Sequence, residues 1–187
     1  ALARQAAIAV ENARLFEAAQ ESQRRTADII DFLPDATLVI DRDGRVLAWN
    51  RAIEELTAVR AAEVVGKGDY EYALPFYGER RPILIDLVLL PDEEIERSYA
   101  QLRREGSALV GEALVPQLRG QSAYLYATAS ALRNSRGEVV GAIESIREIT
   151  EWKRTEEALN ESEKQFRDLA DLLPQIVYEA DLDGNLI

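Results

Sequence analysis

Thr37-Leu38-Val39-Ile40-Asp41-Arg42-Asp43-Gly44-Arg45-Val46-Leu47-Ala48-Trp49 is the stretch that decides how this chain folds. Two runs of strand-forming residues, about 37–42 and 45–49, flank Asp43-Gly44, and glycine tolerates the positive φ that a tight turn requires. The stretch therefore predicts a β-hairpin. Two aspartates in the turn could also begin a calcium loop, but the further oxygen ligands of such a loop do not follow.

Short helices are expected directly after the hairpin. Asn50 is a good N-cap for a helix over 51–56. A second helical turn over 61–65 should end at Gly66. The sequence Gly66-Lys67-Gly68 does not form a phosphate-binding loop, because the remaining glycines and the Lys-Ser/Thr ending are absent.

A longer helix and three strands are expected further along. Pro82 and Pro91 each suit the first turn of a helix. In the helix after Pro91, acidic residues 92–94 lie at the start, Arg103 and Arg104 lie in the last turn, and Gly106 ends it. Its predicted buried stripe is Ile95, Tyr99 and Leu102. Three β-rich runs follow at about 108–118, 122–132 and 138–149, separated by turn residues.

Both ends of the chain are predicted to be helical. Residues 1 to about 23 contain no Gly or Pro, and apolar side chains recur at spacings of three and four, which is typical of a helix that pairs with another helix. This seam consists of Leu2, Ala6, Ala9, Ala13 and Phe16. The alternative is an amphipathic helix that packs on its own domain.

The C-terminal helix should run from Thr150 to about Asp171. Its apolar residues repeat every seven positions, as in a coiled coil, at Trp152, Leu159, Phe166 and Leu173. Because Thr155 and Ser162 are polar, the seam should be weak on its own. We expect a parallel homodimer that uses both terminal helices. The rival is a monomer whose C-terminal helix folds back onto the sheet.

An internal repeat indicates how the domains are organised. Asp31, Leu33, Pro34, Asp41, Asp43 and Gly44 recur, each 140 residues later, as Asp171, Leu173, Pro174, Asp181, Asp183 and Gly184. The last residues should therefore begin a second copy of the domain that starts near residue 29.

Composition excludes several classes of protein. The 187 residues carry a formal net charge of −12, which argues against partners such as nucleic acid or an anionic membrane. No apolar stretch approaches the roughly 20 residues that span a bilayer. Because the chain has no Cys and no His, it cannot form disulfides or thiolate metal sites, and it lacks the usual general base. Because Met is also absent, we expect a piece of a longer chain, and we expect this piece to have no catalytic residues, no metal site and a cytoplasmic location.

These segments together resemble the PAS family of sensor domains. The opening motifs are Leu33-Pro34-Asp35-Ala36, 39–46 and Trp49-Asn50-Arg51-Ala52, and the closing motifs are 137–143 and Glu148-Ile149-Thr150-Glu151-Trp152-Lys153. The resemblance covers about 27–153. It departs from the family at Ala58, where Gly is usual, and at Glu148, where Asp is usual. Residues 1–16 resemble the last helix of a GAF domain.

The resemblance implies an α+β fold with a five-stranded antiparallel sheet in the order 2-1-5-4-3, flanked by helices. It also implies a helical connector over 1–26, a PAS domain over 27–150, a connector helix over 151–168 and the start of a second PAS domain over 169–187. Such modules occur in sensor histidine kinases of two-component phosphorelay systems. The junction that passes the signal to the C-terminal helix would consist of Glu148, Ile149, Thr150 and Trp152.

Two functions remain open for this module, which are sensing of a small molecule and purely structural relay through a dimer. Sensing requires a cavity with a few polar groups in an apolar wall. The candidate residues are Tyr70, Tyr72, Phe76, Tyr77, Arg80, Arg81, Tyr124, Tyr126 and Thr128. The alternative is that the tyrosines are core or interface residues and the arginines pair with surface acids.

On the opposite face of the strand that carries Tyr124, most side chains are small. This face leaves room either for a ligand or for a close-packed helix. It consists of Ala123, Leu125, Ala127, Ala129 and Ala131. Haem bound by His and a cysteinyl flavin adduct are excluded because the chain has neither residue type. The identity of a ligand stays open.

Overall fold

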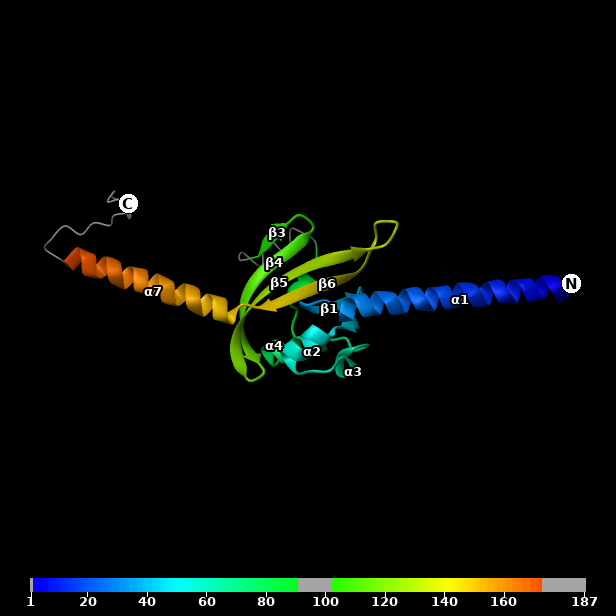
Figure 1. The fold of residues 1–187 in the computed structure, drawn as a ribbon, viewed down its shortest axis with the longest axis horizontal. Coiled ribbons are helices and arrows are strands. Elements are labelled where there is room, and N and C mark those ends of the chain that lie inside the picture. Colours follow the sequence, from blue (N-terminus) through cyan, green and yellow to red (C-terminus); the bar gives the residue numbers. More distant parts are fainter. Residues whose placement is uncertain (1, 91–101, 173–187) are drawn as a thin grey trace, which may run out of the picture. The chain divides into compact units, whose positions relative to one another are not determined.

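Six strands form one antiparallel sheet in the computed structural model, which describes residues 2–90 and 102–172. They are β1 (Ala36–Asp41), β2 (Val46–Trp49), β3 (Arg103–Glu105), β4 (Ala108–Leu118), β5 (Gln121–Arg133) and β6 (Val139–Glu148). The strand order is β2-β1-β6-β5-β4-β3 (Figure 1). The five predicted strands are all present in the predicted order, and β3 adds a sixth at the edge beside β4.

The hairpin forms as predicted between β1 and β2. The Asp41 carboxylate accepts hydrogen bonds from the backbone N–H groups of Asp43 and Arg45 at 2.9 and 2.8 Å. Gly44 has a φ of +75°, which is the conformation that the turn requires. On its other side β1 pairs with β6, and Val39 lies directly opposite Ile143. This pairing joins the start and the end of the domain.

Short helices cover one face of the sheet. They are α2 (Arg51–Thr57), α3 (Ala61–Val64), the 3₁₀ helix η1 (Glu71–Ala73), α4 (Leu74–Tyr77) and α5 (Leu84–Leu87). Figure 1 shows α2, α3 and α4 together on one side of the sheet. Asn50 caps α2 as predicted, because its side chain accepts a hydrogen bond from the backbone N–H of Ile53.

The hydrophobic core lies between this face and the short helices. Alternate residues of the strands point into it, and residues of the helices complete it. Its largest fully buried side chains include Leu38, Ile40, Val46, Ile53, Val64, Tyr72, Phe76, Ile85 and Val115.

The region before β4 differs from the sequence prediction. Arg103 and Arg104 belong to β3 and pair with Val110 and Leu109, whereas we predicted the last turn of a helix. Gly106 has a φ of +64° in the tight turn between β3 and β4, so it reverses the chain instead of ending a helix. A turn and a helix end both favour glycine at positive φ, so composition could not separate them. The predicted stripe residues Ile95 and Tyr99 lie outside the described residues.

Two long helices lie at the ends of the described chain, α1 (Leu2–Asp31) and α7 (Thr150–Leu172). Helix α1 continues past the predicted end near residue 23, because no glycine or proline interrupts it before Pro34. Contacts divide the chain into two compact units, Ala1–Glu148 and Ile149–Ile187. The repeat beyond Leu172 lies outside the described residues. Within the described ranges, no helix is both long enough and apolar enough to cross a membrane.

Candidate functional site

A cavity of about 180 Å³ lies between the sheet and the segment that contains α4 and α5. Its wall is mostly apolar and comes from α4, α5, the loop between them and strands β4 to β6. The lining residues are Phe76, Tyr77, Arg81, Pro82, Ile83, Leu84, Leu87, Leu102, Gly111, Glu112, Ala113, Val115, Leu125, Ala127, Glu144 and Ile146. An apolar cavity of about 150 Å³ can take up benzene, so this one has room for a ligand of one-ring size.

Glu144 is the buried polar group of the cavity. It lies in the middle of β6 on the same face as Ala142 and Ile146, and only 2% of it is exposed. Its Oε2 atom accepts a hydrogen bond from the backbone N–H of Ile85 at 2.8 Å. Burial raises the pKa of Glu144 to about 8; the Ile85 N–H opposes this shift, and nearby Asp86 adds to it.

Asp86 on α5 is the second carboxyl group of this region. It accepts hydrogen bonds from the backbone N–H of Ile83, at 2.8 Å, and from the hydroxyl group of Tyr72. Burial raises the pKa of Asp86, and the two hydrogen bonds oppose that shift. Burial and the bond to Asp86 also raise the pKa of Tyr72. Tyr72 therefore stays a neutral hydrogen-bond donor that fixes α5 against η1.

Tyr77 and Arg81 contribute further polar groups to the cavity wall. The guanidinium carbon of Arg81 lies 4.8 Å from the centre of the Tyr77 ring, within the range of a cation–π contact. Burial raises the pKa of Tyr77, and the carboxyl group of Glu144 raises it further, while Arg81 lowers it. Tyr77 is thus close enough to Glu144 for the two groups to influence each other.

The structure places three of the predicted pocket residues, Phe76, Tyr77 and Arg81, in the cavity wall. Tyr72 lies in the core outside that wall, and Tyr70 is exposed and meets the Tyr72 ring edge-on at a centroid distance of 6.3 Å. The aromatic cluster is therefore divided between a cavity and an ordinary core contact.

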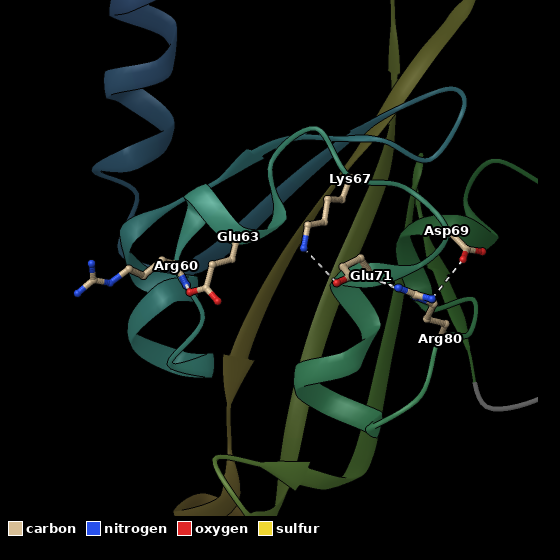
Figure 2. Close-up of polar contacts among 6 residues, drawn as sticks. All are labelled: Arg60, Glu63, Lys67, Asp69, Glu71 and Arg80. Atoms are coloured by element: carbon tan, nitrogen blue, oxygen red, sulfur yellow. Dashed lines mark hydrogen bonds and ion pairs between the residues drawn. The ribbon is translucent and has the colours of Figure 1, made fainter.

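Arg80 belongs to a surface cluster and does not line the cavity. Figure 2 shows it between Asp69 and Glu71, with Lys67 on the other side of Glu71. The hydrogen bond from Arg80, and then the one from Lys67, lower the pKa of Glu71. In the same view Glu63 accepts a hydrogen bond from the backbone N–H of Arg60 at 3.2 Å. The pairing of Arg80 with surface acids matches the alternative considered from the sequence.

Tyr124, Tyr126 and Thr128 lie on the other face of the sheet from the cavity. Leu125 and Ala127 line the cavity, and side chains alternate along a strand, so the three polar residues point the opposite way. The prediction that they line the pocket was wrong. The other face of β5, which carries the small residues, is the face that lines the cavity, through Leu125 and Ala127.

Glu144 was missed from the sequence, although a signal was present. It follows Ala142 and precedes Ile146 at spacings of two, so strand periodicity places its carboxyl group on the core-facing side. A charged residue at a core position of a strand is unusual and marks a candidate site.

Asn50 does more than cap α2. Its Oδ1 atom also accepts a hydrogen bond from the backbone N–H of Thr37 at 2.8 Å. Its Nδ2 atom donates to the carbonyl oxygens of Ile30, Leu33 and Asp35 at 3.1, 3.3 and 3.0 Å. One buried amide thus connects the end of α1, the start of β1 and α2.

Asp35 connects the same region to β6. Its Oδ2 atom lies 2.8 Å from Nη2 of Arg147, next to the end of the strand, and the same Nη2 also donates to Oδ1 at 3.0 Å. Glu148, the last residue of β6, lies 3.5 Å from Arg119. In the second unit, α7 begins at Thr150, and the backbone carbonyl of Ile149 accepts a hydrogen bond from Lys153.

Apolar side chains of the predicted helix seams are exposed. On α7, the exposed fractions of Trp152, Leu159 and Phe166 are 55, 60 and 58%. On α1, Ala13 and Phe16 are also exposed. The side chains of Leu2, Ala6 and Ala9, together with Leu173, lie outside the described part of the chain. Over the ranges that the structure describes, no cluster of acidic side chains could hold a metal ion.

Comparisons with known proteins agree with this architecture. The chain is 25% identical over 167 residues to the signal transduction histidine-protein kinase AtoS of Escherichia coli, a match that covers 88% of this chain but only 24% of the kinase. An RNA-binding light-oxygen-voltage receptor is similar in structure, with a TM-score of 0.53, 19% identity, and coverage of 78% of this chain and 38% of the receptor.

The PAS domain of Bordetella pertussis BvgS is 24% identical, with a TM-score of 0.48 and coverage of 78% of this chain and 98% of that domain. The sequence model of the PAS fold matches residues 30–154, which include every strand of the sheet and the whole cavity. The chain belongs to the PAS-fold family of sensory, signal-transducing proteins.

Proposed function

We propose that this PAS module senses a small molecule bound in the cavity between α4, α5 and the sheet. The observation that carries the proposal is a cavity of about 180 Å³ whose wall is mostly apolar and contains one deeply buried carboxyl group, Glu144. Small-molecule sites typically combine an apolar wall with a few fixed polar groups. The Ile85 N–H fixes this carboxyl group, so it is a defined contact for a ligand.

A ligand in this cavity would touch the strand that ends the domain. Ile146 lines the cavity and lies two residues before Glu148, the last residue of β6. Arg147 forms an ion pair with Asp35, and Glu148 forms one with Arg119. A change in the position of β6 would disturb these ion pairs, and the chain runs directly from Glu148 into the C-terminal helix.

The output of this module is proposed to be the activity of a sensor histidine kinase. The similarity to a kinase of this class supports it, and the chain spans about a quarter of that kinase. In such a protein the module would regulate phosphorelay without taking part in the chemistry. The catalytic groups would lie outside the sequence described above.

Native mass spectrometry of the purified chain tests the sensing proposal. We expect an additional mass from a non-covalently bound small molecule, or its uptake from a cell extract. Ala127→Leu should abolish the added mass, because Ala127 lines the cavity and the larger side chain would fill it. Ala131→Leu is the matched control on the same strand, away from the cavity, and should retain the added mass. No small molecule on the wild-type chain, or equal uptake by both variants, would contradict the proposal.

A second candidate function is relay through a homodimer without any ligand. The exposed heptad of Trp152, Leu159 and Phe166 on α7 favours it, since such a stripe suits a partner helix. Two helix packings that differ by a few kcal/mol can be interchanged by a small movement of the sheet. The two functions are compatible, because a dimer can carry the signal that a ligand starts.

A further inference from the structure

We infer that the cavity binds a small organic cation, an amine of about one-ring size whose ammonium group pairs with the Glu144 carboxylate. This inference rests on the proposed sensing function and adds the chemical class of the ligand. It follows from the shape of the cavity, from the position of its buried carboxyl group and from the charges that surround it.

The shape of the cavity limits the ligand to an apolar body with one polar end. Phe76, Ile83, Leu87, Val115 and Leu125 supply an apolar wall on several sides. A ring or a short branched alkyl group would bury its surface against these side chains at roughly 25 cal/mol per Å². The polar end must then meet a polar group of the wall, because an unpaired polar group is costly to bury.

The position of Glu144 defines where that polar end binds. Its carboxyl group is almost completely buried, and the Ile85 N–H holds Oε2 at 2.8 Å. Among the ion pairs of the described residues, none involves Glu144. A buried carboxylate without a cation is strongly disfavoured, so a ligand that brings a cation gains the pairing energy that the protein does not supply.

The charged and titratable groups around Glu144 favour a cation over an anion. Asp86 on α5 is acidic and interacts electrostatically with Glu144. Glu112 on β4 pairs with Tyr126, so its exposed side chain lies on the other face of the sheet. The hydroxyl groups of Tyr72 on η1 and Tyr77 on α4 stay neutral, since burial raises the pKa of both.

Arg81, in the loop before α5, is the cationic side chain among the described lining residues. Its guanidinium group stacks on the Tyr77 ring, and its side chain is about half exposed. It therefore lies at the solvent side of the cavity. An anion would meet the Glu144 carboxyl group at the buried end, whereas an ammonium group would find a carboxylate partner there.

Binding of an amine should depend on pH in a defined direction. Without ligand, Glu144 is largely protonated below about pH 8. An ammonium ligand pairs with the ionised form, so binding below that pH releases one proton. The affinity should rise with pH, approaching tenfold per unit well below pH 8, should level off near that pH, and should fall again where the ammonium group itself loses its proton. A neutral ligand that accepts a hydrogen bond from the protonated acid would show the opposite trend.

Three matched probes test the inference by isothermal titration calorimetry on the whole chain: benzylamine, benzyl alcohol and benzoate. They share one ring and differ in the charge of the polar end. We expect benzylamine to bind at least tenfold more tightly than the other two near pH 8. Glu144→Gln should remove most of this preference and the pH dependence. Glu55→Gln, which removes one exposed acid from α2, should leave both unchanged. Circular dichroism would show that each variant is folded.

Outcomes that overturn the inference are distinct from failure of the sensing proposal. If benzyl alcohol binds as tightly as benzylamine, and Ala127→Leu abolishes both, the cavity is a ligand site but the amine class is wrong. The amine class is also wrong if benzoate binds more tightly than benzylamine, or if Glu144→Gln leaves the affinity for benzylamine unchanged. If no probe binds, the amine inference also fails, and native mass spectrometry of the chain decides the sensing proposal separately.

Discussion

The Oε2 atom of Glu144 lies 2.8 Å from the backbone nitrogen of Ile85, so one hydrogen bond joins the middle of β6 to α5 beside the cavity. The two residues are 59 positions apart in the sequence. Because burial favours the protonated acid, this contact is sensitive to pH even without a ligand.

The first prediction concerns stability and pH. Burial raises the pKa of Glu144 from 4.5 to about 8, so between these values the folded chain holds a proton that the unfolded chain has released. Its contribution to the free energy of unfolding is therefore complete below about pH 4.5 and is lost as the pH rises to about 8. Urea denaturation across this range should show that the wild type loses stability relative to Glu144→Gln. Parallel pH profiles for the two proteins would contradict the prediction.

The second prediction concerns Asn50. Replacing it with Ala removes the α2 cap and leaves buried backbone groups unpaired, so the free energy of unfolding should fall by about 2–4 kcal/mol. Asn50→Ser keeps a cap for α2 and should cost less, about 1–2 kcal/mol. Asn50→Asp should cost more than Ser, because a carboxylate oxygen would face the carbonyl oxygens of Ile30, Leu33 and Asp35. If Asn50→Asp is as stable as the wild type, the three hydrogen bonds from the Asn50 amide to these carbonyl oxygens contribute little to stability.

The third prediction concerns Ala58, where the PAS family usually has glycine. The residue ends α2 with a φ of +60°, a left-handed conformation that costs a residue with a side chain roughly 1–2 kcal/mol. Ala58→Gly should therefore raise the free energy of unfolding by about 0.5–1 kcal/mol, after the entropy cost of glycine. Ala62→Gly, at an exposed helical position of α3, is the matched control and should lower it by a similar amount. Equal effects of the two substitutions would argue against strain at Ala58.

The fourth prediction concerns the heptad of α7. If Leu159 and Phe166 pack against a second copy, Leu159→Glu and Phe166→Glu should each shift sedimentation of the chain toward the monomer, because a buried charge disrupts a coiled-coil seam. Asn160→Glu adds the same charge one position away from the stripe and should leave the association unchanged. A wild-type chain that stays monomeric at high concentration, or a dimer indifferent to both charges, would favour the rival in which α7 folds back.

Local signals made much of this fold predictable. The hairpin depends on Asp43-Gly44 between two alternating runs, and the cap of α2 depends on Asn50, so each is encoded within a few residues. The three long strands have the same local character. Strand β3 was not predictable in this way. Arg103 and Arg104 become a strand because β4 offers them an edge to pair with, which is a tertiary effect that overrides helix propensity.

The site was less predictable than the fold, because it depends on which face of a strand meets the helices. Tyr126 and Thr128 are polar and on one face of β5, but the cavity lies on the face of Ala127. A search for polar clusters selected the wrong face and passed over Glu144, which is isolated among apolar neighbours on β6. The arrangement of Phe76, Tyr77 and Arg81 around a hollow also depends on α4 and α5, whose positions no local pattern specifies.

Asp35 gives β6 a second set of contacts, separate from those at the cavity. Its backbone carbonyl binds the Asn50 amide that also holds the last turn of α1, and its carboxylate binds Arg147 beside the end of β6. Movement of α1 therefore has a continuous set of polar contacts to β6 that bypasses the cavity. The same strand carries Glu144 and Ile146 inside the cavity. The end of β6 is thus a point of convergence, where a displacement of α1 and a change in the cavity wall act on the same strand.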